Sequence, residues 1–196
     1  YCAERNIPHR RLGKLLIATD ASERAALASY AERAAANGVP LEPLTAAEVL
    51  QLEPAARAIA GLYSESTGIL DSHQLMVALL GDAEQAGAVL VTHTPVVAGK
   101  IESDGFLLRT GGDDPFELRC RMLVNSAGLY AQELARCLEG FPAECVPPTF
   151  YAKGHYFTLS GRAPFQHLVY PMPDHAGLGI HVTLDLGGQC KFGPDV

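Results

Sequence analysis

The sequence predicts a mixed α+β fold on the basis of two observations. Helical and strand-like patterns alternate from the N-terminus to about residue 146. From Pro147 onward the helical patterns stop, and short β-rich runs separated by Ser160-Gly161, 174–177 and Gly187-Gly188 follow. Such runs are typical of an antiparallel sheet with one covered and one open face. The 196 residues are enough to bury a core of ordinary size.

The first predicted elements are a strand and a helix. The apolar run Lys14–Thr19 predicts a short buried strand. An alanine-rich helix then begins at Ser22 and ends at Asn37-Gly38, a pair that is typical of a helix C-terminus.

Two further helices are predicted before residue 88. Thr45 and Glu48 form a capping box, and the helix that they start ends before Pro54. Residues 53–68 lack a regular pattern and are interpreted as a surface loop. A third helix begins at Asp71 or Ser72 and ends at Gly87.

The sequence pattern in the middle of the chain predicts a group of strands. Residues 88–92 (AVLVT) are interpreted as one strand. Residues 96–102 and 106–110 flank Ser103-Asp104-Gly105, a turn that favours a hairpin. A further strand, 117–124, leads into a turn of small residues.

This small-residue turn, Asn125–Gly128, is followed by a helix predicted to extend to about Glu139. The N-terminus of a helix presents unpaired N–H groups and partial positive charge, which suits phosphate. Gly128 has no side chain, so a ligand can approach its backbone. The alternative is a tight strand-to-helix turn in which Ala127 and Gly128 only permit packing.

Composition and charge argue against several classes of function. The net charge of −7, without a basic stripe, disfavours nucleic-acid binding. No apolar stretch reaches the roughly 20 residues of a membrane span, and no targeting signal is visible, so we expect a cytoplasmic protein. The scattered histidines lack metal-ligand spacing, and we predict no metal site.

Six segments occur in the order typical of one family. They are TGILDSHQL (67–75), VNSAGLYA (124–131), AKGHYFTL (152–159), LVYPMPD (168–174), LGIHVT (178–183) and KFGPDV (191–196). With them the sequence resembles the FAD-dependent oxidoreductases that include D-amino-acid oxidase and glycine oxidase. Within that family it is most similar to the L-2-hydroxyglutarate dehydrogenase/oxidase branch.

The resemblance implies an incomplete glutathione-reductase-like FAD-binding fold. The family's G-x-G-x-x-G phosphate loop does not occur in this sequence, which begins with Tyr1, and we expect both ends to be cut from a longer protein. Three parts are implied: a helical and strand segment of the substrate side (1–72), part of the FAD-binding domain with its β-meander (73–146), and an antiparallel β substrate-binding part (147–196).

The activity implied by the resemblance is oxidation of a small 2-hydroxy acid by hydride transfer to FAD, with L-2-hydroxyglutarate favoured. The partner is then a small carboxylate substrate, and the sequence identifies no electron acceptor. Two alternatives stay open. One is an amine-oxidising relative of the glycine or D-amino-acid oxidase type, and the other is a catalytically silent fragment that lacks the phosphate loop.

Four residues are expected to carry the chemistry. His181 is expected to be the base, because imidazole exchanges protons near neutral pH and strand alternation points it away from Ile180 and Val182. Lys153 is expected to attract the substrate carboxylate or the reduced flavin. Tyr170 is expected to donate its hydroxyl group to the substrate. Tyr156 lies three residues after Lys153 on a predicted strand, so the two side chains face opposite sides and only one is expected to meet the cavity directly. The alternatives are a histidine on the open sheet face, a solvated edge lysine and half-buried aromatic residues.

Five residues are expected to contact the cofactor. Val97, Ala127, Gly128 and Leu129 are expected to lie beside the nucleotide part of FAD. Gly154 is expected to allow close approach of the flavin ring.

Overall fold

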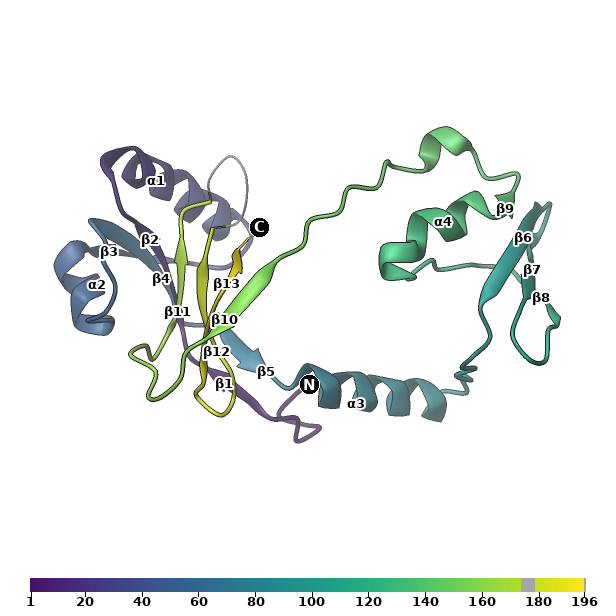
Figure 1. Cartoon of the computed structure of the whole chain (residues 1–196), viewed down its shortest axis with the longest axis horizontal. Helices are drawn as coiled ribbons and strands as arrows, with labels where there is room; N and C mark the ends of the chain where they lie inside the picture. The colour runs from purple at the N-terminus through teal and green to yellow at the C-terminus, as the bar shows by residue number, and fades with distance from the viewer. Residues whose placement is uncertain (174–178, 196) are drawn as a thin grey trace. The chain divides into compact units, whose positions relative to one another are not determined.

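The computed structural model describes residues 1–173 and 179–195, and the chain divides into two compact units (Figure 1). The first unit comprises Tyr1–Asp82 and Ala152–Val196, and the second comprises Ala83–Tyr151. The predicted boundaries, after residues 72 and 146, lie N-terminal to the observed boundaries, after Asp82 and Tyr151. The predicted turn 174–177 lies outside the described residues.

A seven-stranded sheet forms the centre of the first unit, in the order β10-β13-β12-β11-β2-β4-β3. Its strands are β2 (Lys14–Ala18), β3 (Glu42–Thr45), β4 (Ala60–Ser64), β10 (His155–Thr158), β11 (Leu168–Pro171), β12 (His181–Leu184) and β13 (Cys190–Asp195). Neighbouring strands are antiparallel except β2 and β11, which pair in parallel. The antiparallel C-terminal strands are confirmed.

The helices of the first unit confirm the sequence-based predictions. They are α1 (Ala21–Ala36), α2 (Ala46–Leu52) and α3 (Ser72–Gln85), and a small ribbon of β1 (His9–Arg11) and β5 (Gly68–Leu70) accompanies them. Asp20 caps α1 by accepting hydrogen bonds from the backbone N–H groups of Ser22 and Glu23. The predicted Thr45–Glu48 capping box is present at α2.

Two small cores lie on opposite faces of the sheet. Leu15 and Ile17 of β2 pack with Val49 of α2. The alternate residue Ala18 packs with Leu27 of α1. Because successive side chains of a strand point to opposite faces, α1 and α2 cover different faces of one sheet.

The prediction of a surface loop at residues 53–68 is wrong. β4 occupies part of this range and lies between β2 and β3, with four of its five residues buried. A strand covered on both faces shows no alternation of apolar and polar residues, so the period-two pattern was missing. Gly61 is needed there because a Cβ atom would lie 2.9 Å from Val49 Cγ2.

The second unit is built on a four-stranded sheet in the order β8-β7-β6-β9. Its strands are β6 (Val96–Glu102), β7 (Gly105–Thr110), β8 (Glu117–Cys120) and β9 (Leu138–Glu139), and its helical segments are η1 (Gly128–Tyr130), α4 (Ala131–Arg136) and η2 (Ala143–Cys145). The predicted hairpin is confirmed, with Glu102 opposite Gly105.

Three predictions for the second unit are wrong. Residues 88–92 form no strand, the strand from Glu117 ends at Cys120, and the helix after Gly128 ends at Arg136. A strand needs a neighbour for its backbone hydrogen bonds, and nothing in the described residues pairs with 88–92 or 121–124. Leu138 does not continue the helix because it lies in β9, which pairs with β6 in parallel and places Leu138 opposite Gly99.

No helix of the described ranges is long and apolar enough to cross a membrane.

A buried carboxylate ties the end of α2 to the segment that leads into β11. Glu53 Oε1 accepts hydrogen bonds from Gln166 N at 2.7 Å, His167 N at 2.5 Å and His167 Nδ1 at 2.7 Å. Glu53 is fully buried. The ring of Tyr63 on β4 meets the imidazole of His167 edge-on. This carboxylate therefore joins parts of the chain that are far apart in sequence.

Replacing Glu53 by alanine is expected to lower the free energy of unfolding by about 3 kcal/mol, because three part-buried donors of Gln166 and His167 lose their acceptor. Urea denaturation of the natural-length protein measures this. Glu42→Ala, at an exposed position of β3, is the control and should change the value by less than about 0.5 kcal/mol. Equal effects of the two substitutions would contradict the role of Glu53.

Burial raises the pKa of the Cys190 thiol, and the negative charge of Glu53 raises it further. In the folded protein the thiol therefore keeps its proton at pH values above the ordinary cysteine pKa of about 8.5. The resulting stabilisation is present below that ordinary value and is lost as the pH rises beyond it. At mildly alkaline pH, iodoacetamide should alkylate the exposed Cys137 and Cys145 before Cys190, as peptide mass spectrometry can measure. Equal alkylation rates for the three cysteines would contradict the predicted protection of Cys190.

Candidate functional site

Two of the predicted catalytic residues stack on each other in the first unit. Val169 of β11 pairs with Val182 of β12, so Tyr170 and His181 are neighbours on the same face of the sheet. Their rings are stacked, with centroids 3.7 Å apart and planes within 4° of parallel. The stack fixes the plane of the imidazole relative to the sheet.

Lys14 extends this pair to the next strand. The Lys14 Nζ atom lies 5.1 Å from the centroid of the Tyr170 ring, a cation–π contact. The parallel pairing of β2 with β11 brings the two strands together at this point. Lys14, Tyr170 and His181 thus form a row across three adjacent strands, which we call the sheet-face row.

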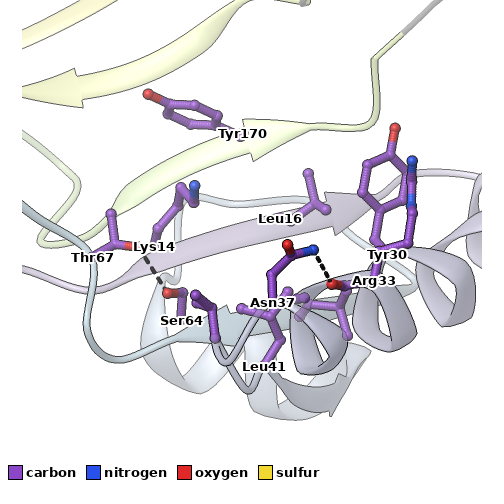
Figure 2. Close-up of a pocket in the computed structure, with 12 residues that line it drawn as sticks. Lys14, Leu16, Tyr30, Arg33, Asn37, Leu41, Ser64, Thr67 and Tyr170 are labelled. Carbon is purple, nitrogen blue, oxygen red and sulfur yellow. Dashed lines mark hydrogen bonds between the residues drawn. The ribbon is translucent and has the colours of Figure 1, made fainter.

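Lys14 and Tyr170 of the row line a cavity of about 550 Å³ between the sheet and α1 (Figure 2). Figure 2 shows Lys14, Ser64 and Thr67 near Tyr170 at one end, and Tyr30 with Arg33 at the other. The lining residues are Lys14, Leu16, Tyr30, Arg33, Ala34, Asn37, Val39, Leu41, Leu62, Ser64, Thr67 and Tyr170. The cavity therefore has polar groups at both ends and aliphatic walls between them.

Tyr156 of β10 lies beside the sheet-face row. Gly193 of β13 pairs with His181, and a Cβ atom on Gly193 would lie 2.7 Å from Tyr156 Cδ1. The Tyr156 ring therefore covers the position where Gly193 has no side chain, next to the imidazole. Sequence spacing alone could not reveal this, because β10 reaches the site through its pairing with β13.

Lys153 and Gly154 lie in the exposed segment before β10. Within the described residues, Lys153 makes no hydrogen bond or ion pair. A Cβ atom on Gly154 would lie 2.6 Å from Pro194 Cβ, so Pro194 fills the space on that side of the glycine. The structure therefore does not bring these two residues into the sheet-face row by any contact.

The second unit holds a separate cavity of about 610 Å³ that Val97 and Ala127 both line. Its other lining residues are Pro95, Val96, Tyr130, Glu133, Leu134 and Cys137. Gly128 has a positive φ of 58°, and nothing lies within 4 Å of where its Cβ would be. Leu129 is 71% exposed. Two of the four residues predicted to lie beside the nucleotide, Val97 and Ala127, thus line one cavity. The other two directly follow Ala127 in the sequence.

Asn125 holds the turn at this cavity, a role that was not predicted. Its Oδ1 accepts a hydrogen bond from Ala127 N at 3.2 Å, and its Nδ2 donates one to Ala131 O at 2.7 Å. Asparagine is typical of turns because its side chain bonds nearby backbone, and this was the signal available in the sequence.

These residues fit the nucleotide part of FAD. The cavity wall is largely apolar, as suits a planar base, and the backbone at Gly128 is open to a ligand. The six residues of α4 make a weaker helix dipole than the predicted helix would have, so shape and backbone access carry the fit. In the part of the chain that the structure describes, no group of His, Cys, Asp or Glu side chains could hold a metal ion.

A model of the family described as "FAD dependent oxidoreductase" matches residues 1–196. The chain belongs to this family of FAD-dependent oxidoreductases. It is 38% identical over 227 residues to a mitochondrial L-2-hydroxyglutarate dehydrogenase of Arabidopsis thaliana, covering 100% of this chain and 47% of that relative. The chain spans about half the length of the curated relatives it matches.

Two solved structures share the fold. L-proline dehydrogenase from P. horikoshii matches with a TM-score of 0.76 and 19% identity, over 100% of this chain and 52% of that one. An FAD-bound L-α-glycerophosphate oxidase from Mycoplasma pneumoniae matches with a TM-score of 0.76 and 24% identity, over 96% and 50%. These likenesses confirm the α+β fold class of the FAD-dependent family.

Filling the cavity of the second unit should weaken FAD binding. Ala127→Phe places a ring in the space that Val97 and Ala127 line. We expect the natural-length protein with this substitution to lose at least half of its bound flavin, as measured by visible absorbance after gel filtration. Ala143→Phe, at an exposed position in η2, is the matched control and should retain it. Full flavin content in Ala127→Phe would exclude the cavity as the nucleotide site.

Proposed function

We propose that this chain is part of an FAD-dependent dehydrogenase or oxidase that oxidises a small 2-hydroxy acid, with L-2-hydroxyglutarate as the favoured substrate. One observation carries the proposal. A row of Lys14, Tyr170 and His181 occurs on one sheet face of a chain that is 38% identical to an L-2-hydroxyglutarate dehydrogenase. A base beside a cation suits a substrate that carries both a hydroxyl group and a carboxylate.

His181 takes the proton of the substrate hydroxyl group. Stacking on Tyr170 holds the imidazole plane, so that a ring nitrogen can be directed at the substrate without loss of rotamer freedom on binding. Tyr156 and Tyr170 border the imidazole, and each brings a hydroxyl group that can orient the substrate. Lys153 is a second cation proposed for the substrate carboxylate or for the reduced cofactor.

FAD, when bound, supplies the two-electron acceptor for the hydride of the substrate carbon. Val97, Ala127, Gly128 and Leu129 would hold its nucleotide part. Gly154 would offer backbone to the flavin ring. A cytoplasmic location is also part of the proposal, and cell fractionation with an antibody would test it.

An amine-oxidising activity is the second candidate, because the fold is shared with an L-proline dehydrogenase. The two candidates differ in the group that loses its proton. Assays of the natural-length protein with L-2-hydroxyglutarate, L-proline and glycine, each with an artificial dye as acceptor, separate them. A colourless natural-length protein without activity on any of the three would favour the silent alternative.

His181→Ala should lower kcat for the 2-hydroxy acid by roughly 100- to 10,000-fold, because the hydroxyl proton loses its acceptor. Stopped-flow measurement of flavin reduction reports this step directly.

His73→Ala, in the first turn of α3, is the control for the loss of an imidazole. A His181→Ala protein that reduces its flavin at the normal rate would contradict the proposed base.

A further inference from the structure

Lys14 carries a charge that the described residues do not neutralise. Some other cations of the chain have carboxylate partners, among them Lys100 with Glu139 at 2.9 Å and Arg5 with Asp82 at 2.7 Å. Lys14 has no ion pair within residues 1–173 and 179–195, although the chain holds 22 acidic residues. It is half-buried, with its ammonium over the Tyr170 ring. A partly buried charge without a counter-charge is costly, which favours the binding of an anion there.

Two contacts set an upper limit on the distance between this ammonium and His181. Nζ lies 5.1 Å from the Tyr170 centroid, and that centroid lies 3.7 Å from the His181 centroid. The ammonium and the imidazole are therefore separated by no more than these two distances together.

A five-carbon dicarboxylate fits this separation. With C–C bonds of roughly 1.5 Å, the second carbon of an extended 2-hydroxy diacid lies roughly 4 Å from its distal carboxyl carbon. A hydrogen bond of about 2.8 Å at each end makes the fully extended path longer than the two contact distances together, so the diacid would span from base to ammonium in a bent conformation. A substrate hydroxyl group at His181 thus places a distal carboxylate within reach of Lys14.

The surroundings of Lys14 also suit a carboxylate. Ser64 and Thr67 lie at the same end of the cavity, and their hydroxyl oxygens are 2.7 Å apart (Figure 2). Two hydroxyl groups share one hydrogen bond between them, so one O–H stays available as a donor to an oxyanion. A carboxylate here would meet an ammonium and a hydroxyl donor together.

Arg33, the other cation that lines this cavity, contacts Tyr30 and Ser29 of α1. Its guanidinium lies 4.4 Å over the Tyr30 ring, and its Nε donates to Ser29 O. It has no contact with the sheet-face row among the described residues. Lys14 is therefore the cation of this cavity that is tied to His181.

We propose that Lys14 binds the distal carboxylate of the substrate and makes the enzyme prefer 2-hydroxy dicarboxylates to 2-hydroxy monocarboxylates. This inference rests on the proposed function of the sheet-face row. It replaces Lys153 as the expected cation for a second carboxylate, because Lys14 is in contact with the row and Lys153 is not.

The test compares two substrates in the natural-length flavoprotein. L-2-hydroxyglutarate and L-2-hydroxypentanoate have the same carbon chain and differ in the distal carboxylate. Lys14→Met should lower the ratio of their kcat/KM values by roughly 10- to 100-fold, the worth of one charge-assisted hydrogen bond. The change should lie in KM for the diacid, with the monoacid altered less than about threefold. Lys14→Arg should keep most of the ratio.

Two further variants and a binding measurement make the test specific. Lys100→Met removes the same charge in the other unit and should leave the ratio unchanged. Calorimetric titration with glutarate, which has no hydroxyl group to oxidise, should show weaker binding to Lys14→Met by a similar factor. Since this readout needs no turnover, it also serves if a variant has low activity.

The outcomes separate the two proposals. A wild-type protein that oxidises neither 2-hydroxy acid overturns the proposed function, whereas the glutarate titration then still decides whether Lys14 binds a diacid. A wild-type protein that prefers L-2-hydroxyglutarate, together with an unchanged ratio in Lys14→Met, overturns the role of Lys14 alone. Loss of the ratio in Lys153→Met instead of Lys14→Met also overturns it.

Discussion

The parallel pairing of β2 with β11 is the constraint on which the sheet-face row depends. Four residues of β2 are in register with four of β11, from Lys14 opposite Leu168 to Ile17 opposite Pro171. The pairing joins an N-terminal strand to strands more than 150 residues later in the chain. Without it, Lys14 would have no contact with Tyr170, and the sheet would separate into two parts. The Glu53 carboxylate supports the same junction by holding the backbone at Gln166 and His167.

The two sites differ in the kind of residue that forms them. The sheet-face row uses side chains whose rings and charge are held by stacking, so its geometry depends on residues that lie on different strands. The cavity beside Ala127 uses small residues and an open backbone, held by the two hydrogen bonds of Asn125. The first arrangement suits proton transfer and recognition of charge, and the second suits contact with a large planar ligand.

Predictions from the sequence were correct where a side chain contacts residues that are close to it in the chain. The Thr45–Glu48 capping box, the end of α1 at Asn37 and the turn at Ser103-Asp104-Gly105 depend on contacts within a few residues. Predictions that needed a partner elsewhere went wrong. Residues 88–92 have the composition of a strand without a neighbour in the described chain, and β4 is a strand that lacks the usual alternation.

The sequence by itself determined the α+β class and the family resemblance, and it predicted His181, Tyr170 and Ala127 as functional residues. It could do so because strand periodicity, capping and short motifs are encoded in adjacent residues. Only the tertiary structure decided that Lys14 belongs with Tyr170 and His181, that Tyr156 covers Gly193, and that Asn125 braces the turn at Ala127. These contacts arise from strand register and side-chain packing between distant segments, and no local pattern specifies which strands will be neighbours.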